Sequence, residues 1–389
     1  MTKKWVADLV AYLDVAATTR VDPRVADVVL HWMTEDFGNA GSRTHEYGTR
    51  AKRAVKEART FLAGTVGAKV EEVIFTSGAT ESNNIALLGI APYGETHQRR
   101  HIITSAIEHK AVVEPLLHLQ SKGFEVDFLE PGPSGRITTE SVLEKLRPDT
   151  LLVSLMHVNN ETGVIQPVAE LARKLRETPT YFHVDAAQGY GKLPEDLKAP
   201  IDLISISGHK VGAPKGVGAL ITRRRGWDKV PLEPIMFGGG QERKLRPGTL
   251  PVPLIMGFYE AAKIFQETRG NWEREAREMR ERILVALAKT RFRINGDAEH
   301  SVPHILNVTF EGLNAEALIV RLKSQVAVAT GSACTSASYT PSHVLTAMGL
   351  PEDVAANGLR FSWFPSQVLD FDPEELAEAV ARMQPDASS

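Results

Sequence analysis

Between about residue 70 and residue 222, short apolar runs alternate with segments whose apolar positions recur three and four residues apart. The runs are rich in β-branched residues and apolar along most of their length, which predicts strands buried on both faces. They lie at residues 72–77, 101–106, 124–129, 150–158, 181–185, 202–207 and 216–222. Helical spacing is clearest at 110–123 and 168–177. This alternation predicts an α/β fold with a mostly parallel sheet and helices on both faces.

The remainder of the chain follows a different pattern. A Pro- and Gly-rich passage at 230–253 is followed by a long helical stretch at 255–290. Strand-like runs at 304–310 and 326–330, a helix-like segment at 314–324 and an acidic helix near 372–383 come next. A chain of 389 residues is too long for one ordinary core. We expect a large α/β domain over 21–258 and a smaller α+β domain formed by 1–20 and 259–389.

Composition and charge narrow the function classes. A charged content of 24% is typical of a globular protein, and a net charge near −3 argues against a surface for nucleic acid or anionic membranes. No run approaches the roughly 18 apolar residues that span a bilayer. Asp8 and Asp14 interrupt the apolar N-terminal stretch, and no signal-cleavage pattern follows. These features predict a cytoplasmic protein without direct contact to nucleic acid or membrane.

Polar residues follow three of the predicted strands. "FTSGATESNN" opens a helix after one strand, Asp185 ends another, and Lys210 lies on a Gly-bounded turn after a third. Taken singly, they are a capped helix, an N-cap and a solvated lysine. The carboxyl ends of parallel strands share one edge, where ligands bind. An anion cradle, a carboxylate and a lysine at this edge match the needs of pyridoxal phosphate: the phosphate, the ring nitrogen and the carbonyl carbon.

A metal site is the weaker interpretation. The chain has 12 histidines, but none has the HExxH spacing of a zinc helix. The single cysteine, Cys334, excludes an internal disulfide and any site in one chain that needs two thiolates. We therefore predict no metal centre.

Nine ordered motifs resemble those of the cysteine desulfurases, which are pyridoxal-phosphate enzymes of the class V aminotransferase group with the type I fold. They are "YLDVAATT", "GNAGSRTHEYG", "FTSGATESNN", "ITSAIEHKAV", "MHVNNETGVIQP", "HVDAAQGYGKLP", "SGHKVGAPKGVGAL", "RPGTLPV" and "GSACTSAS". The resemblance extends from about residue 11 to 365. The loop after Cys334 resembles that of the cysteine desulfurase subgroup in which this loop is the longer one.

The resemblance implies a role for each matching residue. Lys210 is similar to the lysine that carries the cofactor and moves protons, and His109 to the imidazole stacked on its ring. The cofactor-binding residues implied are Ala79, Thr80, Asp185, Gln188, Ser207, His209 and Thr249, and the substrate-carboxylate residues are Asn160, Arg360 and Asn39. In the family, the residue matching Thr249 serves the other subunit, which implies a homodimer. Ordinary alternatives stay open: His109 caps a helix, Gln188 follows a turn, or Arg360 pairs with an acidic residue.

The reaction implied by the resemblance explains the lone thiol. L-cysteine reacts through an aldimine and a ketimine of pyridoxal phosphate, and Cys334 attacks the activated sulfur. The products are L-alanine and a persulfide on Cys334, which a thiolate nucleophile would form. Small residues surround Cys334 across 328–342 and predict a mobile tether that carries sulfur to an acceptor protein. A buried filler is the ordinary alternative for a lone cysteine, but these neighbours supply little apolar cover.

The sequence departs from the family pattern at a few positions, and it leaves other functions open. Pro247 in "RPGT" removes a backbone donor, and Trp363 and Phe364 are expected to reshape the substrate entrance. Selenocysteine lyase, a plain aminotransferase and an inactive scaffold of a sulfur-transfer complex are the alternatives. The sequence leaves the destination of the sulfur open among iron–sulfur cluster assembly, tRNA thiolation and sulfur modification of DNA.

Overall fold

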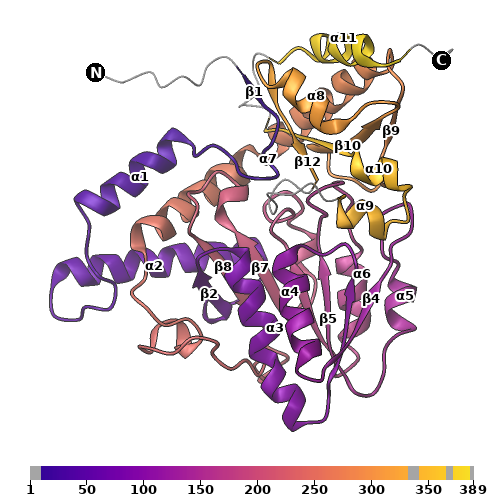
Figure 1. The fold of residues 1–389 in the computed structure, drawn as a ribbon. Helices are drawn as coiled ribbons and strands as arrows, with labels where there is room; N and C mark the ends of the chain where they lie inside the picture. Colours follow the sequence, from indigo (N-terminus) through magenta and orange to yellow (C-terminus); the bar gives the residue numbers. More distant parts are fainter. Residues whose placement is uncertain (1–9, 332–340, 365–370, 386–389) are drawn as a thin grey trace.

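The computed structural model describes residues 10–331, 341–364 and 371–385, and it contains a large and a small sheet, each packed against helices (Figure 1). The seven-stranded sheet has the order β2-β8-β7-β6-β5-β3-β4. Its strands are β2 (Val73–Thr76), β3 (His101–Ser105), β4 (Glu125–Leu129), β5 (Thr150–Met156), β6 (Tyr181–Asp185), β7 (Leu203–Ser207) and β8 (Gly218–Thr222). Each lies within one of the predicted runs. The mostly parallel sheet is confirmed, because among these strands only β8 runs in the direction opposite to the others.

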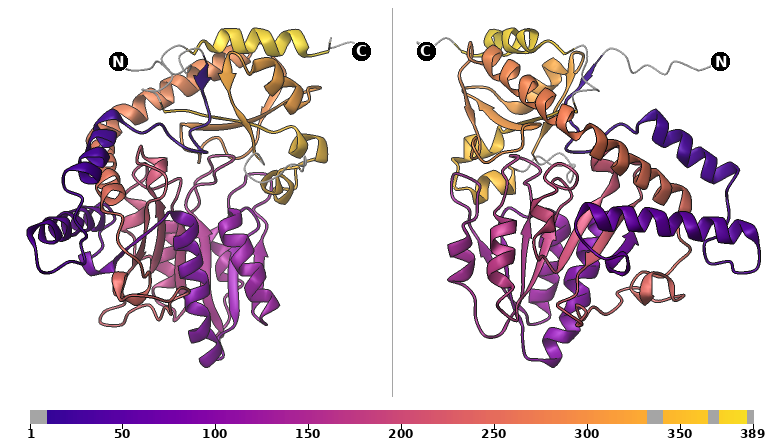
Figure 2. Two further views of the ribbon diagram at one scale, coloured as in Figure 1. Left: turned by 60° about the vertical axis from the view of Figure 1, so that its left-hand side comes forward. Right: turned by 180° about the vertical axis from the view of Figure 1, so that it is seen from behind.

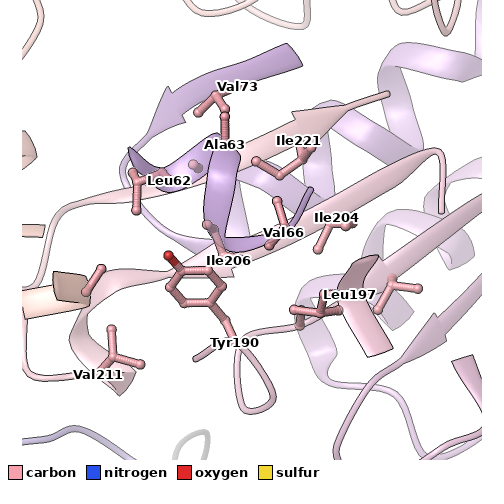
Figure 3. Close-up of a cluster of buried hydrophobic side chains, with 14 of the residues drawn as sticks. Leu62, Ala63, Val66, Val73, Tyr190, Leu197, Ile204, Ile206, Val211 and Ile221 are labelled. Carbon is pink, nitrogen blue, oxygen red and sulfur yellow. The ribbon is translucent and has the colours of Figure 1, made fainter. Parts of the chain in front are cut away.

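Helices cover both faces of the large sheet. One face carries α3 (Ala79–Thr96) and α4 (Lys110–Ser121); the other carries α2 (Glu46–Thr65), α5 (Thr139–Leu143), α6 (Val168–Leu175) and the first half of α7 (Val252–Leu287). Successive strand residues point to opposite faces, so Ile74 belongs to the first core and Phe75 to the second. Figure 3 shows part of the second core, where Leu62 and Val66 lie near strand residues. No helix in the described ranges has both the length and the apolarity to cross a membrane.

The small sheet is antiparallel, with the order β12-β13-β10-β9. Its strands are β9 (Phe292–Ile294), β10 (Ile305–Phe310), β12 (Ala329–Thr330) and β13 (Leu359–Ser362). Its core also contains residues of α8 (Ala315–Leu322) and α11 (Pro373–Met383), while α9 (His343–Ala347) and α10 (Glu352–Ala356) form a separate cluster with residues of the large sheet. The run 326–330 is two strands rather than one, because β11 (Val326–Ala327) pairs with β1 (Ala11–Tyr12) and β12 pairs with β13.

The long helix α7 connects the two cores. Its first half places Ala261 and Phe265 against the large sheet, and its second half places Ile283 and Leu287 in the core of the small sheet. Figure 2 shows α7 running from one part of the molecule to the other, with α1 (Pro23–Thr34) packed along it. The helix is continuous through residue 258, and the domain limits at 20/21 and 258/259 remain a prediction.

Candidate active site

A cavity of about 500 Å³ lies at the carboxyl ends of the large sheet's strands. It collects residues from turns after five strands of that sheet, together with one residue of β13. Of the residues singled out in the sequence, the following line it: Ala79, Thr80, His109, Asn160, Asp185, Gln188, Ser207, His209, Lys210 and Arg360. The fold thus brings together side chains that are up to 344 positions apart in the chain, from Ala16 to Arg360.

The N-terminus of α3 forms one wall of the cavity. Gly78 has φ 154° and ψ −176°, a backbone conformation that suits glycine, and it directs the chain from β2 into the helix. Ala79 and Thr80 form the first turn, where backbone N–H groups have no partner inside the helix. Ser207 lies opposite, with its Oγ 3.6 Å from where a Cβ of Gly78 would stand. Backbone donors and a hydroxyl at a helix N-terminus are chemically suited to a phosphate.

Asp185 ends β6 and is almost fully buried, with 5% of its surface exposed. Its Oδ2 accepts a hydrogen bond of 2.7 Å from Asn83 Nδ2, and its Oδ1 accepts one of 2.9 Å from the N–H of Ala187. Both carboxylate oxygens are therefore held in place at the cavity wall. The sequence analysis missed Asn83, although its position one helical turn after Ala79 places both residues on one face of α3.

Lys210 lies in a 3-10 turn, Gly208–Lys210, directly after β7. Its Nζ donates to the carbonyl oxygens of Ala16 at 2.5 Å and Ala17 at 2.7 Å. Behind it, Lys192 Nζ donates to the Lys210 carbonyl at 3.1 Å, and burial together with the charge of Lys210 lowers the pKa of Lys192 to about 7. The Lys192 amine thus lies behind the backbone of Lys210, and of these two lysines only Lys210 lines the cavity.

Burial lowers the pKa of both histidines of the cavity. His109 caps α4, and its Nδ1 accepts the N–H of Ala111 at 3.1 Å, so the neutral ring carries its proton on Nε2. Burial and neighbouring Lys210 lower the pKa of His209 to about 4. The capping alternative for His109 is correct, and the same ring also lines the cavity.

Glu108 supports the turn that presents His109. It is fully buried, and its Oε1 accepts from Ser105 Oγ at 2.6 Å and from the N–H of Met156 at 2.8 Å. Burial raises the pKa of Glu108 to about 8. The sequence analysis did not identify this residue, because only the fold joins β3 to the end of β5 here.

Arg360 enters the cavity from the small sheet. Its Nη2 is 2.7 Å from Asp14 Oδ1, and its Nη1 donates to the carbonyl of Asn160 at 3.0 Å. The alternative in which Arg360 pairs with an acidic residue is therefore correct for this structure. The pair holds the guanidinium beside Asn160, and a guanidinium fork is suited to binding a carboxylate.

Two singled-out residues, Asn39 and Thr249, do not line this cavity. Asn39 is exposed after α1, and its Oδ1 accepts the N–H of Gly41 at 2.8 Å. Thr249 is exposed in the passage after the 3-10 turn Gln241–Lys244. Cys334 lies outside the described residues, as does most of the expected mobile segment at 328–342.

The expectation that Trp363 and Phe364 reshape the substrate entrance is wrong. Trp363 is fully buried in the core beside the small sheet, where its Nε1 donates to the carbonyl of Ala276 at 3.2 Å. Phe364 packs edge-on against Phe265 with ring centroids 5.9 Å apart. Neither lines the cavity, because the chain leaves β13 away from it toward α7.

No group of three or more His, Cys, Asp or Glu side chains within the described part of the chain is close enough to hold a metal ion.

Comparison with known proteins identifies the family. Residues 11–367 match the family described as Aminotransferase class-V. Cysteine desulfurase IscS of Escherichia coli O139:H28 is 44% identical over 380 residues, covering 96% of this chain and 93% of the relative. The crystal structure of DndA from Streptomyces lividans aligns with a TM-score of 0.81 and 72% identity, covering 91% of this chain and 99% of the other. A structure of SspA in complex with cysteine aligns with a TM-score of 0.81 and 38% identity over the same shares. The chain belongs to the class V aminotransferase family and, within it, to the cysteine desulfurases.

Proposed function

We propose that the cavity around Lys210 binds pyridoxal 5'-phosphate and L-cysteine, and that the sulfur of the substrate leaves as a persulfide on Cys334. The observation that carries this proposal is that four groups line a single cavity: an anion cradle, a buried carboxylate, a lysine and a guanidinium. Each group suits a different part of a cofactor–substrate pair. A site that only bound a ligand, without catalysing a reaction, would not require the lysine and the guanidinium together.

The residues fit the cofactor by charge and donor type. Ala79, Thr80 and Ser207 would hold the phosphate through N–H and O–H donors, since a helix N-terminus favours an anion. Asp185 would hold a proton on the ring nitrogen, and its two oxygens are kept in position by Asn83 and the backbone. When bound, the cofactor withdraws electrons from the substrate Cα–H and Cβ–S bonds.

The protein's own residues would then move protons and hold the substrate. Lys210 would bind the cofactor and take the proton from the substrate Cα, and Arg360 with Asn160 would hold the substrate carboxylate. His109, neutral because burial lowers its pKa, is available at the cavity as a proton donor through Nε2–H. The Cys334 thiolate attacks the substrate sulfur, so the Cβ–S bond breaks and an S–S bond forms. L-cysteine and the protein thiol become L-alanine and a protein persulfide, which balances all atoms without an external oxidant.

A homodimer is part of this proposal. Thr249 is exposed and does not line the cavity of its own chain, as expected if it serves the cavity of a second copy. Figure 1 shows α1 and the start of α2 projecting from the rest of the molecule. Large apolar side chains are exposed there: Leu30 by 59%, Met33 by 55%, Phe37 by 63% and Tyr47 by 51%. Such a grouped apolar surface is typical of an interface.

We favour sulfur modification of DNA as the destination of the sulfur, with a protein acceptor between the enzyme and the DNA. The match to DndA, at 72% identity, is much stronger than the 44% match to IscS. The net charge of −3 argues against direct binding of nucleic acid by the enzyme itself.

The test uses purified full-length protein supplied with pyridoxal phosphate and L-cysteine. Mass spectrometry should find a gain of one sulfur atom on Cys334 and an equal amount of L-alanine. Borohydride reduction before substrate is added should attach the cofactor to Lys210 and leave the nearby Lys192 and Lys215 unmodified. Cys334→Ser should keep the cofactor on Lys210 but form no persulfide. Cofactor on another lysine, or alanine formation at the normal rate by Cys334→Ser, would refute the proposal.

A further inference from the structure

Glu161 is a buried carboxylate beside the cavity, and neither the sequence analysis nor the proposed mechanism gives it a role. It follows Asn160 directly and is 3% exposed. Asn159 Oδ1 accepts the N–H of Glu161 at 2.9 Å, and the carbonyl of Glu161 accepts from Asn307 Nδ2 at 3.3 Å. The backbone of Glu161 is thus attached both to the turn after β5 and to β10 of the small sheet.

Its carboxylate contacts the chain on the C-terminal side of the cysteine segment. Ser342 Oγ donates to Glu161 Oε2 at 2.5 Å, and both residues are buried. The same hydroxyl accepts the N–H of Leu345 at 3.1 Å and so caps α9. One hydroxyl therefore joins the start of α9 to Glu161.

The same carboxylate contacts the chain on the N-terminal side of that segment. Gly331 follows β12, in which Ala329 is the partner of Arg360 across the ladder. A Cβ placed on Gly331 would lie 1.9 Å from Glu161 Oε2 and 2.8 Å from its Cδ. The carboxylate therefore packs directly against the backbone of Gly331, where no side chain fits.

We propose that Glu161 is a positioning residue that holds both ends of the segment between Gly331 and Ser342, and so sets where the Cys334 thiol starts its reaction. The inference rests on the proposed role of Cys334. Cys334 is the third residue after Gly331, and three steps along the chain reach at most about 11 Å even when fully extended. The arm from Cys334 to Ser342 is eight residues long, so the shorter arm limits the reach of the sulfur.

The position of Glu161 also relates this anchor to the substrate. Its neighbour Asn160 accepts from Arg360, and Arg360 is paired across the ladder with the strand that leads to Gly331. Asn160, whose carbonyl accepts from the Arg360 guanidinium, and Glu161, which contacts Gly331 and Ser342, are thus adjacent on one short stretch of backbone. A shift of Glu161 changes the distance between substrate and thiol, although Glu161 itself takes no part in the chemistry.

The variants that test this role are Glu161→Ala, Ser342→Ala, the double variant and Glu161→Gln. Asn314→Ala is the matched control, since Asn314 caps α8 through a 2.9 Å bond to the N–H of Ala317 and is remote in sequence from Glu161. It removes a helix cap of the same kind as Ser342 without removing a bond to Glu161.

Two measurements are made on each variant in the cofactor-loaded enzyme. The first is the rate at which iodoacetamide alkylates Cys334 without substrate. This rate reports on one site, because the chain has only one cysteine. The second is the single-turnover rate of persulfide formation at saturating L-cysteine. We expect Glu161→Ala and Ser342→Ala each to slow persulfide formation about tenfold, the effect of losing a hydrogen bond to a charged group. Alkylation should become several-fold faster in both.

The pattern across variants separates positioning from general stability. The double variant should be no slower than the worse single variant, because both remove one contact. Glu161→Gln should recover much of the rate, since its amide oxygen still accepts from Ser342. Equal slowing by Asn314→Ala, or normal rates in both Glu161→Ala and Ser342→Ala, would overturn the proposal. If the wild type forms no persulfide, the proposed function fails, while the alkylation rates still test the anchoring.

Discussion

The buried pair between Arg59 and Glu242 leads to a stability prediction that can be worked out from contacts. Arg59 Nη2 lies 2.5 Å from Glu242 Oε1, and Nη1 donates to Oε2 at 2.8 Å. The side chains are only 13% and 3% exposed. Glu242 Oε2 also accepts the N–H of Phe75 at 2.7 Å, so it satisfies a donor on β2, the edge strand of the large sheet.

This pair also holds an unusual backbone. Glu242, Arg243 and Lys244 have φ values of 43°, 58° and 70°, three successive left-handed residues without a glycine. Each such residue costs about 1–2 kcal/mol, and contacts elsewhere must offset that cost. The contacts of Glu242 with Arg59 and Phe75 help to offset this conformational cost.

Replacing Glu242 by Ala leaves the Arg59 guanidinium buried without its partner, and breaking a buried pair in this way costs about 3–5 kcal/mol. We expect the free energy of unfolding to fall by that amount, measured by urea denaturation of the cofactor-loaded enzyme with circular dichroism. Because the double variant Arg59→Ala/Glu242→Ala removes both charges, it should lose at least about 1 kcal/mol less than the sum of the single variants. A loss below about 1 kcal/mol for Glu242→Ala, or strictly additive losses, would refute the reasoning.

Three further predictions concern other parts of the molecule. Asp185→Asn should lower the rate of alanine formation at least about a hundredfold while leaving urea stability nearly unchanged, since the shape is kept and the Asn83 amide can turn its Oδ1, which has no other partner among the described residues, toward the new NH2 group; an active variant would contradict the role given to the carboxylate. Trp363→Ala should cost about 3–5 kcal/mol of stability with no change in KM for cysteine, because this side chain fills a core and does not line the cavity; a changed KM at normal stability would contradict this. Burial lowers the pKa of His183 to about 4, so below pH 6.5 the unfolded chain takes up a proton that the native state does not. Stability should therefore fall between pH 6.5 and pH 4, by about 2 kcal/mol from this residue at pH 5, and His183→Gln should reduce the fall seen by urea denaturation at pH 7 and pH 5; an identical pH dependence in the variant would contradict it.

Most strands of the large sheet could be predicted because they are buried apolar runs, and burial on both faces leaves a continuous signal; the edge strand β4 is only partly buried. The same reasoning placed Asp185 and Lys210 at one edge, since parallel strands end on the same side. The run 326–330 was less informative. Its two halves join different sheets, and nothing within five residues indicates which partner each half has.

Residues that act through distant partners were not found. Asn83 binds Asp185 across 102 positions, and Glu161 binds Ser342 across 181. Trp363 was misplaced for a related reason: a bulky residue after a cavity-lining strand is equally consistent with an entrance and with a core. Its direction depends on α7, which supplies the acceptor at Ala276.

Local sequence is enough to establish the secondary structure and the chemical groups of this enzyme: which runs form strands, which turns carry an anion cradle, a carboxylate and a lysine, and that one thiol is present. Backbone propensity and burial pattern act over a few residues, so these features can be read locally. The tertiary structure alone decided the partners. It buried Lys192 behind Lys210, lowered the pKa of His109, paired Arg360 with Asp14 and set Glu161 against both ends of the cysteine segment. These outcomes depend on desolvation and on contacts between remote parts of the chain, and both arise only when the two sheets pack together.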